Sequence, residues 1–201
     1  MFIVPREAPG LRVGVIEDKL GLRLNQNAEL IFEDCAIPHD QVLGEVNGAA
    51  PILRAIGPSS KAKEGAKTLG IGRAALDAGR QWAASRVQGG VPLAEHQVIG
   101  NSLAELAMEL EAARTLVWRA AWASDHDRGA ADSLSDMAKV LSSRVVVRVS
   151  LRSLELHGGH GIRRGTAAER NLRNAVTMLH ATGGNDALLA RLHRDLWRAG
   201  S

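Results

Sequence analysis

The sequence has few aromatic residues: two Phe, four Trp and no Tyr among 201 residues. Hydrophobic residues nevertheless make up 45% of the chain, so we expect a core built from Leu, Val, Ile and Ala. A single cysteine, Cys35, excludes an internal disulfide and favours a reducing compartment. No uncharged apolar run approaches the roughly 18 residues that span a bilayer, and the N-terminal MFIVPREAPG is not typical of a signal peptide. The sequence therefore predicts a cytoplasmic protein without a membrane span.

Clusters of basic residues are also missing. The formal net charge is +3, yet the arginines are scattered and no basic run alternates with aromatic residues. Nucleic-acid binding is therefore not predicted. Scattered guanidinium groups are equally suited to the phosphates of a cofactor or to an acidic partner.

The first 47 residues have a different pattern from the rest of the chain. Phe2–Val4 is a short β-type run that Pro5 stops, Leu11–Ile16 alternates imperfectly, and Asn27–Ile37 is a third strand candidate. Three strands make a thin sheet with unpaired edges. We therefore expect residues 1–47 to be part of a larger β domain, or to need a partner.

From about residue 50 onward, apolar residues recur at helical spacing. Turn residues at 125–129 and glycines at 158–161 end two of three long helical segments, and short helices follow at Ala167–Ala175 and after Gly184. The spaced apolar residues include Ile71, Ala75, Ala78 and Trp82, then Leu106, Leu110, Ala113 and Val117, then Leu134, Ala138, Leu141, Val145 and Val149. The sequence predicts a mainly α fold: an up-and-down four-helix bundle over residues 48–201, preceded by a small incomplete antiparallel β segment.

The corner between the first two long helices, RVQGGVPLAEHQ, carries the first candidate site. Arg86 offers a planar fork of donors suited to phosphate oxygens, and Gln97 lies where a helix start leaves unpaired amides. Together they are suited to a phosphate-bearing ligand. The alternative is a surface arginine, stabilised by the dipole at a helix C-terminus, beside a solvated glutamine.

Two glycine-rich turns are further candidates. Gly158 and Gly159 permit close approach of a ligand to the backbone, but no strand precedes them, so they are not a dinucleotide fingerprint. The neighbouring His157 and His160 lack an accompanying carboxylate or cysteine cluster, so no metal site is predicted. The alternative reading of this turn is a simple helix end.

The second turn, HATGGND, precedes the last helix. Thr182, Asn185 or Asp186 is suited to capping that helix. Its glycine pair is also suited to an anion-binding nest of backbone amides.

The order of these segments resembles the C-terminal half of the acyl-CoA dehydrogenase family of flavoproteins. The segments FIVPREAPGLRV and ELIFEDCAIPHDQVLGE are similar to the end of the family's middle β domain. GIGRAALDAGRQWAASR, GVPLAEHQVI and LAELAMELEAAR are similar to the first two helices of its C-terminal bundle, and SLELHGGHGI and AAERNLRNA to the signature after the third. The resemblance covers nearly the whole chain.

The resemblance implies FAD as the cofactor, held between the middle domain and the bundle, with a second subunit reaching its pyrophosphate. It assigns Arg86 to the cross-subunit pyrophosphate contact and Gln97 as its companion. It places the Gly158–Gly159 turn on the adenine side, and Gly184 and Asp186 in a loop that also touches the cofactor.

Two cofactor positions depart from the family pattern. Gly89 stands three residues after the arginine, where the family usually has an aromatic residue, so a stacking contact is missing. Glu155 stands where the family often has an amide, and a carboxylate facing pyrophosphate would repel it.

The catalytic base also departs from the pattern. The family's usual glutamate, which removes the α-proton of the thioester, corresponds to Thr182, and the position that a minority of members use corresponds to Ser60. Neither side chain is a base at neutral pH. The nearest acids in the sequence are Glu64, Glu169 and Asp186.

The resemblance implies FAD-dependent α,β-desaturation of an acyl-CoA thioester in fatty acid metabolism, by an enzyme of which this chain forms part. Three alternatives remain open: a non-catalytic subunit or fragment that completes a partner's FAD site, a flavin-dependent monooxygenase relative, and a bundle used only for oligomer contacts. The expected partners are an acyl-CoA, an electron acceptor that the residues do not specify, and further subunits, in a homo-oligomer or in a heteromeric dehydrogenase.

Overall fold

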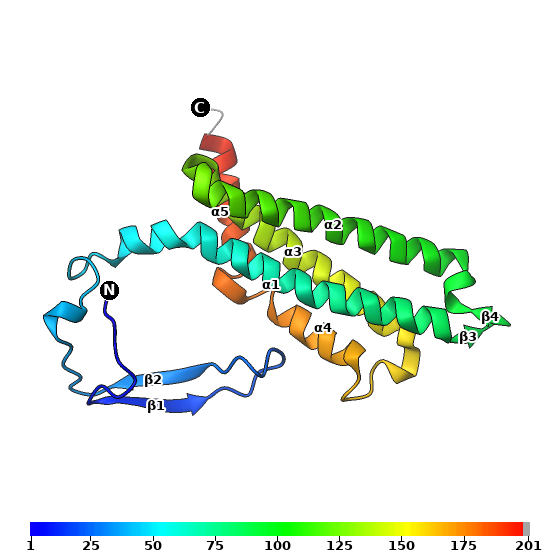
Figure 1. Cartoon of the computed structure of the whole chain (residues 1–201), viewed down its shortest axis with the longest axis horizontal. Coiled ribbons are helices and arrows are strands. Elements are labelled where there is room, and N and C mark those ends of the chain that lie inside the picture. The colour runs from blue at the N-terminus through cyan, green and yellow to red at the C-terminus, as the bar shows by residue number, and fades with distance from the viewer. Residues whose placement is uncertain (199–201) are drawn as a thin grey trace. The chain divides into compact units, whose positions relative to one another are not determined.

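The computed structural model describes residues 1–198, and they form two compact units, Met1–Gly57 and the chain from Pro58 onward (Figure 1). The long helix α1 (Ala49–Ser85) begins in the first unit and continues through the second. Among the described residues, no helix combines the length and the apolarity that crossing a membrane requires.

The first unit contains one antiparallel hairpin, β1 (Leu11–Ile16) and β2 (Ala28–Phe32), which confirms two of the predicted strands. Leu11 pairs with Phe32, and the register shifts before Ile16 pairs with Ala28. The prediction of a strand at Phe2–Val4, the first of the three candidates, was wrong, because only an isolated bridge joins Phe2 to Val42. The second strand is also shorter than predicted, since Asp34 turns the chain with a φ of 50°.

Neither strand of this hairpin has a second β neighbour within the described residues. Its apolar side chains are largely exposed, including those of Val13, Val15, Ile16, Leu30 and Phe32. Unpaired N–H and C=O groups beside exposed apolar side chains are the features of a sheet that another segment completes.

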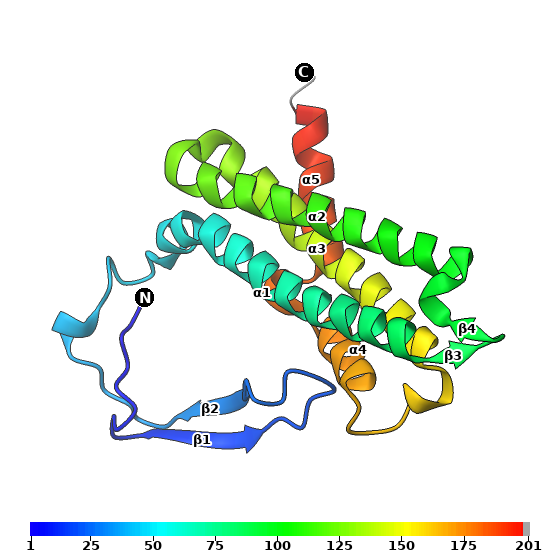
Figure 2. The same cartoon turned by 45° about the vertical axis from the view of Figure 1, so that its right-hand side comes forward.

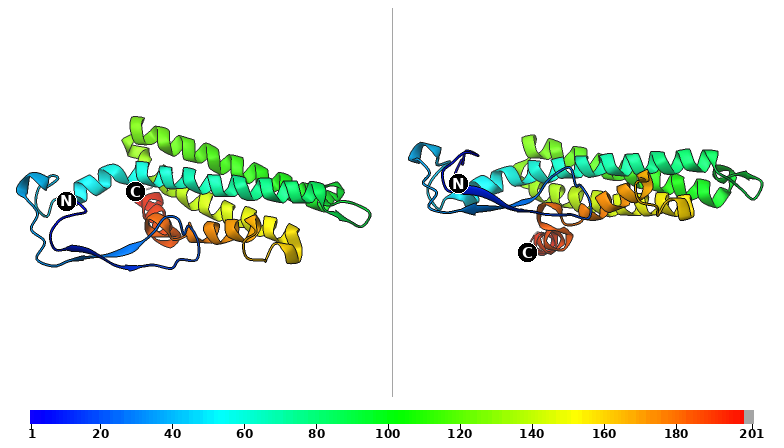
Figure 3. Two further views of the ribbon diagram at one scale, coloured as in Figure 1. Left: turned by 60° about the horizontal axis from the view of Figure 1, so that its bottom comes forward. Right: turned by 90° about the horizontal axis from the view of Figure 1, so that it is seen from below.

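The second unit is a helical bundle, as predicted. Its helices after α1 are α2 (Gln97–His126), α3 (Arg128–His157), α4 (Ala167–Thr177) and α5 (Asn185–Arg198). The long helices α1, α2 and α3 run alternately up and down, and α4 lies alongside α3 (Figure 2). Helix α5 crosses their long axis steeply (Figure 3).

Local signals set the helix ends. Asp127 alone separates α2 from α3, and its carboxylate accepts a hydrogen bond of 3.2 Å from the Ala130 amide. Gly158, with a φ of 55°, ends α3. Thr166 caps α4 by accepting from the Glu169 amide. These boundaries confirm the turns and the short fourth helix that the sequence predicts.

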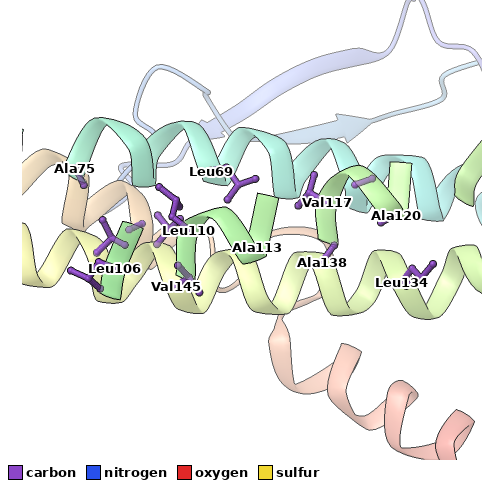
Figure 4. Packing of buried hydrophobic residues seen from close by; sticks show 14 of the residues in the cluster. Leu69, Ala75, Leu106, Leu110, Ala113, Val117, Ala120, Leu134, Ala138 and Val145 are labelled. Atoms are coloured by element: carbon purple, nitrogen blue, oxygen red, sulfur yellow. The ribbon is translucent and has the colours of Figure 1, made fainter. Parts of the chain in front are cut away.

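Small residues bring α1 close to its neighbours in the core (Figure 4). Three buried glycines of α1, Gly65, Gly72 and Gly79, stand seven residues apart and share one face. A Cβ atom on Gly72 would lie 2.6 Å from Val146 Cγ2 and 2.9 Å from Leu110 Cδ1. The absence of a side chain at this position therefore sets the spacing between α1, α2 and α3.

The two glycines Gly70 and Gly72 should respond to alanine with opposite signs. At Gly70 an added Cβ meets nothing within 4 Å, so Gly70→Ala should stabilise the chain by about 0.5–1 kcal/mol through the helix propensity of alanine. At Gly72 the methyl group overpacks a site closed by buried Val146, and Gly72→Ala should cost about 1–3 kcal/mol. Urea unfolding followed by circular dichroism measures both. A stabilising Gly72→Ala would show that α1 packs more loosely than this.

A buried charge cluster that the sequence did not predict joins three helices. Asp136 of α3 is 0% exposed, and its Oδ1 accepts from Lys61 Nζ of α1 at 2.6 Å. Arg191 of α5 donates to both oxygens of the same carboxylate. Burying a charge without a partner is costly, and here the pairing ties α5 to α1 and α3.

Candidate functional site

The corner after α1 is a tight β-hairpin. Strand β3 (Val87–Gln88) pairs with β4 (Val91–Pro92) through a two-residue turn, Gly89–Gly90. Both turn residues have positive φ, 66° and 89°, as a type I′ hairpin turn requires. An aromatic residue at position 89 would be strained there, and its Cβ would lie 3.3 Å from the His96 ring. The turn conformation therefore accounts for the glycine that departs from the family pattern.

Arg86, between α1 and this hairpin, lines a groove of about 400 Å³ together with Gly158 and Gly159 from the end of α3. Its other walls are Trp82, Gln88, Leu93, Leu156, His157 and His160. The structure thus brings together two parts of the predicted site that lie far apart in the sequence. The Arg86 side chain is exposed and forms no ion pair within the described part of the chain.

The groove combines a cation with glycine backbone, two features suited to a phosphate group. The Arg86 guanidinium offers two parallel N–H donors to phosphate oxygens. Added Cβ atoms at Gly158 and Gly159 would meet nothing within 4 Å, so the backbone is open on that side. Gly158 has φ 55° and ψ −139°, a conformation that favours glycine. Open glycine backbone in the same groove as an arginine is an arrangement suited to a phosphate-bearing ligand.

Trp82 forms an apolar wall of the groove, held by two histidines. Its ring stacks on His157, with centroids 4.7 Å apart, and on His160, with centroids 4.9 Å apart. The His157 Nδ1–H donates to the Ser153 carbonyl at 2.6 Å, which orients that ring. Within the described residues, no group of three or more His, Cys, Asp or Glu is placed to hold a metal. The two histidines considered as metal ligands are instead part of an aromatic stack.

Gln97 and Glu155 are not among the residues that line the groove. Gln97 is the first residue of α2, as predicted, and is exposed. The Glu155 carboxylate pairs with Arg152 Nη1 at 3.1 Å, one turn back on α3. Arg152 Nε also donates to Ser102 Oγ of α2 at 3.3 Å. Because the Glu155 charge is compensated on its own helix, it weakens a nearby phosphate site less than a free carboxylate would.

The loop at the predicted base position has a left-handed backbone. Thr182 has φ 51° and ψ 42°, and Gly183 and Gly184 have φ 104° and 72°. A β-branched residue in this region is strained, at a cost of about 1–3 kcal/mol. Asp186, in the first turn of α5, is exposed. The conformation suits the glycines of this loop better than it suits Thr182.

Two of the three acids nearest in the sequence, Glu169 and Glu64, pair with basic residues. The Arg173 guanidinium, with Nε 2.6 Å from Glu169 Oε2, and the Gly165 amide lower the pKa of Glu169 to about 2. Glu64 pairs with Lys67 at 2.7 Å, one turn on from Ser60. A carboxylate held ionised by arginine is a poor base at neutral pH, so Glu169 is not suited to act as a general base.

Three residues of the site region were not singled out from the sequence: Trp82 as a groove wall, Gln88, and Lys139 beneath the Thr182 loop. The position of Lys139 in the sequence could have indicated that it is buried. It directly follows the core residue Ala138 and precedes Ser142 and Ser143, all fully buried. A lysine at core spacing requires a buried acceptor.

Known proteins similar to this chain come from one enzyme family. A family profile described as "Acyl-CoA dehydrogenase, C-terminal domain" matches residues 61–196. The mitochondrial short-chain specific acyl-CoA dehydrogenase of Homo sapiens is 38% identical over 174 residues, covering 87% of this chain and 42% of that protein. Cyclohexane-1-carbonyl-CoA dehydrogenase of Geobacter metallireducens is 34% identical over 185 residues, covering 92% of this chain and 48% of that protein.

The solved structure of butyryl-CoA dehydrogenase from Megasphaera elsdenii superimposes with a TM-score of 0.92 at 31% identity. The match covers 98% of this chain and 51% of that one. The chain therefore spans about half the length of the relatives it matches. Fold, sequence and matched region agree: the chain belongs to the acyl-CoA dehydrogenase family.

Proposed function

We propose that this chain is the C-terminal part of a flavoprotein that desaturates an acyl-CoA thioester between its α and β carbons, and that its role is to help hold FAD. The observation that carries the proposal is the groove that unites Arg86 with the open backbone of Gly158 and Gly159. Bound FAD supplies the hydride acceptor for such a reaction. The family membership supports the same reaction class.

In this proposal the residues of the chain bind and orient. Arg86 neutralises the diphosphate of the cofactor, and the Gly158–Gly159 backbone approaches it from the other side. Trp82 excludes water from one wall of the groove because two stacked histidines fix its ring. The remaining parts of the site come from another segment or subunit. The free outer edges of the β1–β2 hairpin are consistent with such an additional segment.

Titration of the ¹⁵N-labelled chain with FAD tests the proposal. We expect weak binding, because the chain holds only part of a site, with shifts concentrated at the Gly158 and Gly159 amides and the Arg86 side chain. Riboflavin, which lacks the diphosphate, should not produce these shifts. Arg86→Ala should weaken FAD binding about tenfold or more, the worth of one charged hydrogen bond.

Arg80→Ala is the matched control. Arg80 is an exposed arginine of α1, the helix that ends just before Arg86. It does not line the groove, and its Nη1 is 3.8 Å from Asp77 Oδ1. It should bind FAD like the unchanged chain. Equal effects of the two variants, or shifts that cluster away from the groove, would refute the diphosphate assignment.

A second candidate function is a subunit that completes a partner's FAD site without catalysing the reaction itself. The observations that favour it are the strained Thr182 at the base position and the engaged Glu169 carboxylate. Ser60, the alternative position, is half-buried on α1 and is not a base.

A further inference from the structure

Lys139 is almost completely buried, at 1% exposure, and it forms no ion pair with a described carboxylate. Its Nζ instead donates to the Leu179 carbonyl at 3.0 Å and to Asn185 Oδ1 at 2.9 Å. Leu179 and Asn185 lie on either side of the loop His180–Gly184. One buried ammonium group therefore joins both ends of the loop that carries the base position.

Further hydrogen bonds fix the same two anchor residues. The backbone N–H of Asn185 donates to the Leu179 carbonyl at 3.2 Å, which closes the two ends of the loop together. Asn185 Nδ2 lies 3.0 Å from Ser143 Oγ, one helical turn after Lys139 on α3. Both polar atoms of the Asn185 side chain are thus held by α3.

The chemistry of the contact distinguishes Lys139 from the other buried lysine of the bundle. Lys61 neutralises the Asp136 carboxylate at 2.6 Å, whereas Lys139 contacts one carbonyl and one amide oxygen. Burial lowers the pKa of Lys139 from its usual value, and the charge of Glu64 opposes that shift. A buried cation without a paired carboxylate is costly, so its presence points to a role in holding the backbone.

The loop requires such an anchor because its conformation is unfavourable. Thr182, Gly183 and Gly184 follow one another with positive φ, and glycines lose more conformational freedom on ordering than other residues. We propose that Lys139 is a positioning residue, which fixes the Thr182–Gly184 loop to α3 and so sets where the side chain at position 182 stands. The functional consequence rests on the proposed function and on the resemblance that places the base at position 182.

Hydrogen exchange of the whole flavin-free chain, followed by mass spectrometry, tests the anchor independently of FAD. In Lys139→Met, the amides of residues 180–188 should exchange at least tenfold faster, while those of α2 keep their protection. Lys139→Arg, which retains the donors, should restore the protection of the loop. Lys61→Met, the control, removes another buried lysine, which pairs with Asp136 and does not touch the loop. It should leave the amides of the loop itself, residues 180–184, unchanged.

Unchanged exchange of the loop in Lys139→Met, or an equal acceleration in both methionine variants, would overturn the proposal. If Lys139→Met does not fold, Asn185→Ala tests the same link from the loop side. The same amides should then exchange faster, and protection at the level of the unchanged chain would overturn the assignment. A negative FAD titration leaves this result untouched, so failure of the anchor and failure of the flavin site are separable.

Discussion

Replacing Asp136 with alanine is expected to lower the free energy of unfolding by about 3–5 kcal/mol, because it removes the buried carboxylate that pairs with the buried Lys61 and with the partly exposed Arg191. Asp136 is 0% exposed and receives hydrogen bonds from Lys61 and Arg191. After the substitution Lys61 retains only Asp132, at 3.4 Å. Urea unfolding followed by circular dichroism measures the loss.

Asp132→Ala is the matched control for this prediction. It removes a carboxylate that contacts the same lysine but whose side chain is 58% exposed. Exposed ion pairs contribute roughly 0–1 kcal/mol, so the control should unfold nearly like the unchanged chain. Similar losses in the two variants would mean that the Asp136 cluster is more hydrated than its burial indicates.

The parts of the fold that local chemistry decides could be predicted from the sequence. Apolar spacing identified the core positions Leu110, Val117 and Val145, all of which are buried. Asp127 and Gly158 lie where helices were expected to end. In each case a few neighbouring residues determine the outcome, because capping and helical periodicity act within one or two turns.

Contacts between distant residues were less predictable. Phe2–Val4 has a β-type sequence, but a single long-range bridge to Val42 decides its pairing. Leu141 has core spacing and is nevertheless 37% exposed, since α3 buries a face that includes Lys139 and Ser142. The polar core escaped prediction because each of its side chains looks solvated until a partner from another helix is known.

The candidate site also contains residues that the sequence placed correctly in the groove and residues that it did not. The resemblance to a family linked Arg86 to Gly158, and the groove brings them together. Gln97 and Glu155 stand at positions that the resemblance assigns to cofactor contacts, but neither lines the groove. The Glu155 carboxylate turns to Arg152, a local pairing that competes with any more distant ligand.

Flavin reduction is expected to be faster with glutamate at position 182 than with threonine, because the proposed site has no base at that position. The experiment joins this chain to the N-terminal half of one of its relatives and follows flavin reduction by butyryl-CoA without oxygen. A general base contributes about 10²–10⁴-fold to such a rate, so Thr182→Glu should raise turnover by that factor. Glutamate is not branched at Cβ, and it also relieves part of the strain that Thr182 experiences at φ 51°.

Thr182→Gln separates the base from the change of shape. Glutamine has the size of glutamate but cannot accept the α-proton as a base, so it should bind flavin and remain at the background rate. Equal turnover in the two variants would show that the carboxylate is not what the loop lacks. High turnover with the original threonine would instead show that another residue serves as the base, and the non-catalytic subunit would then be excluded. A gain with glutamate alone identifies a site that is intact in its cofactor contacts and lacks one proton acceptor, since the groove at Arg86 is the same in all three proteins.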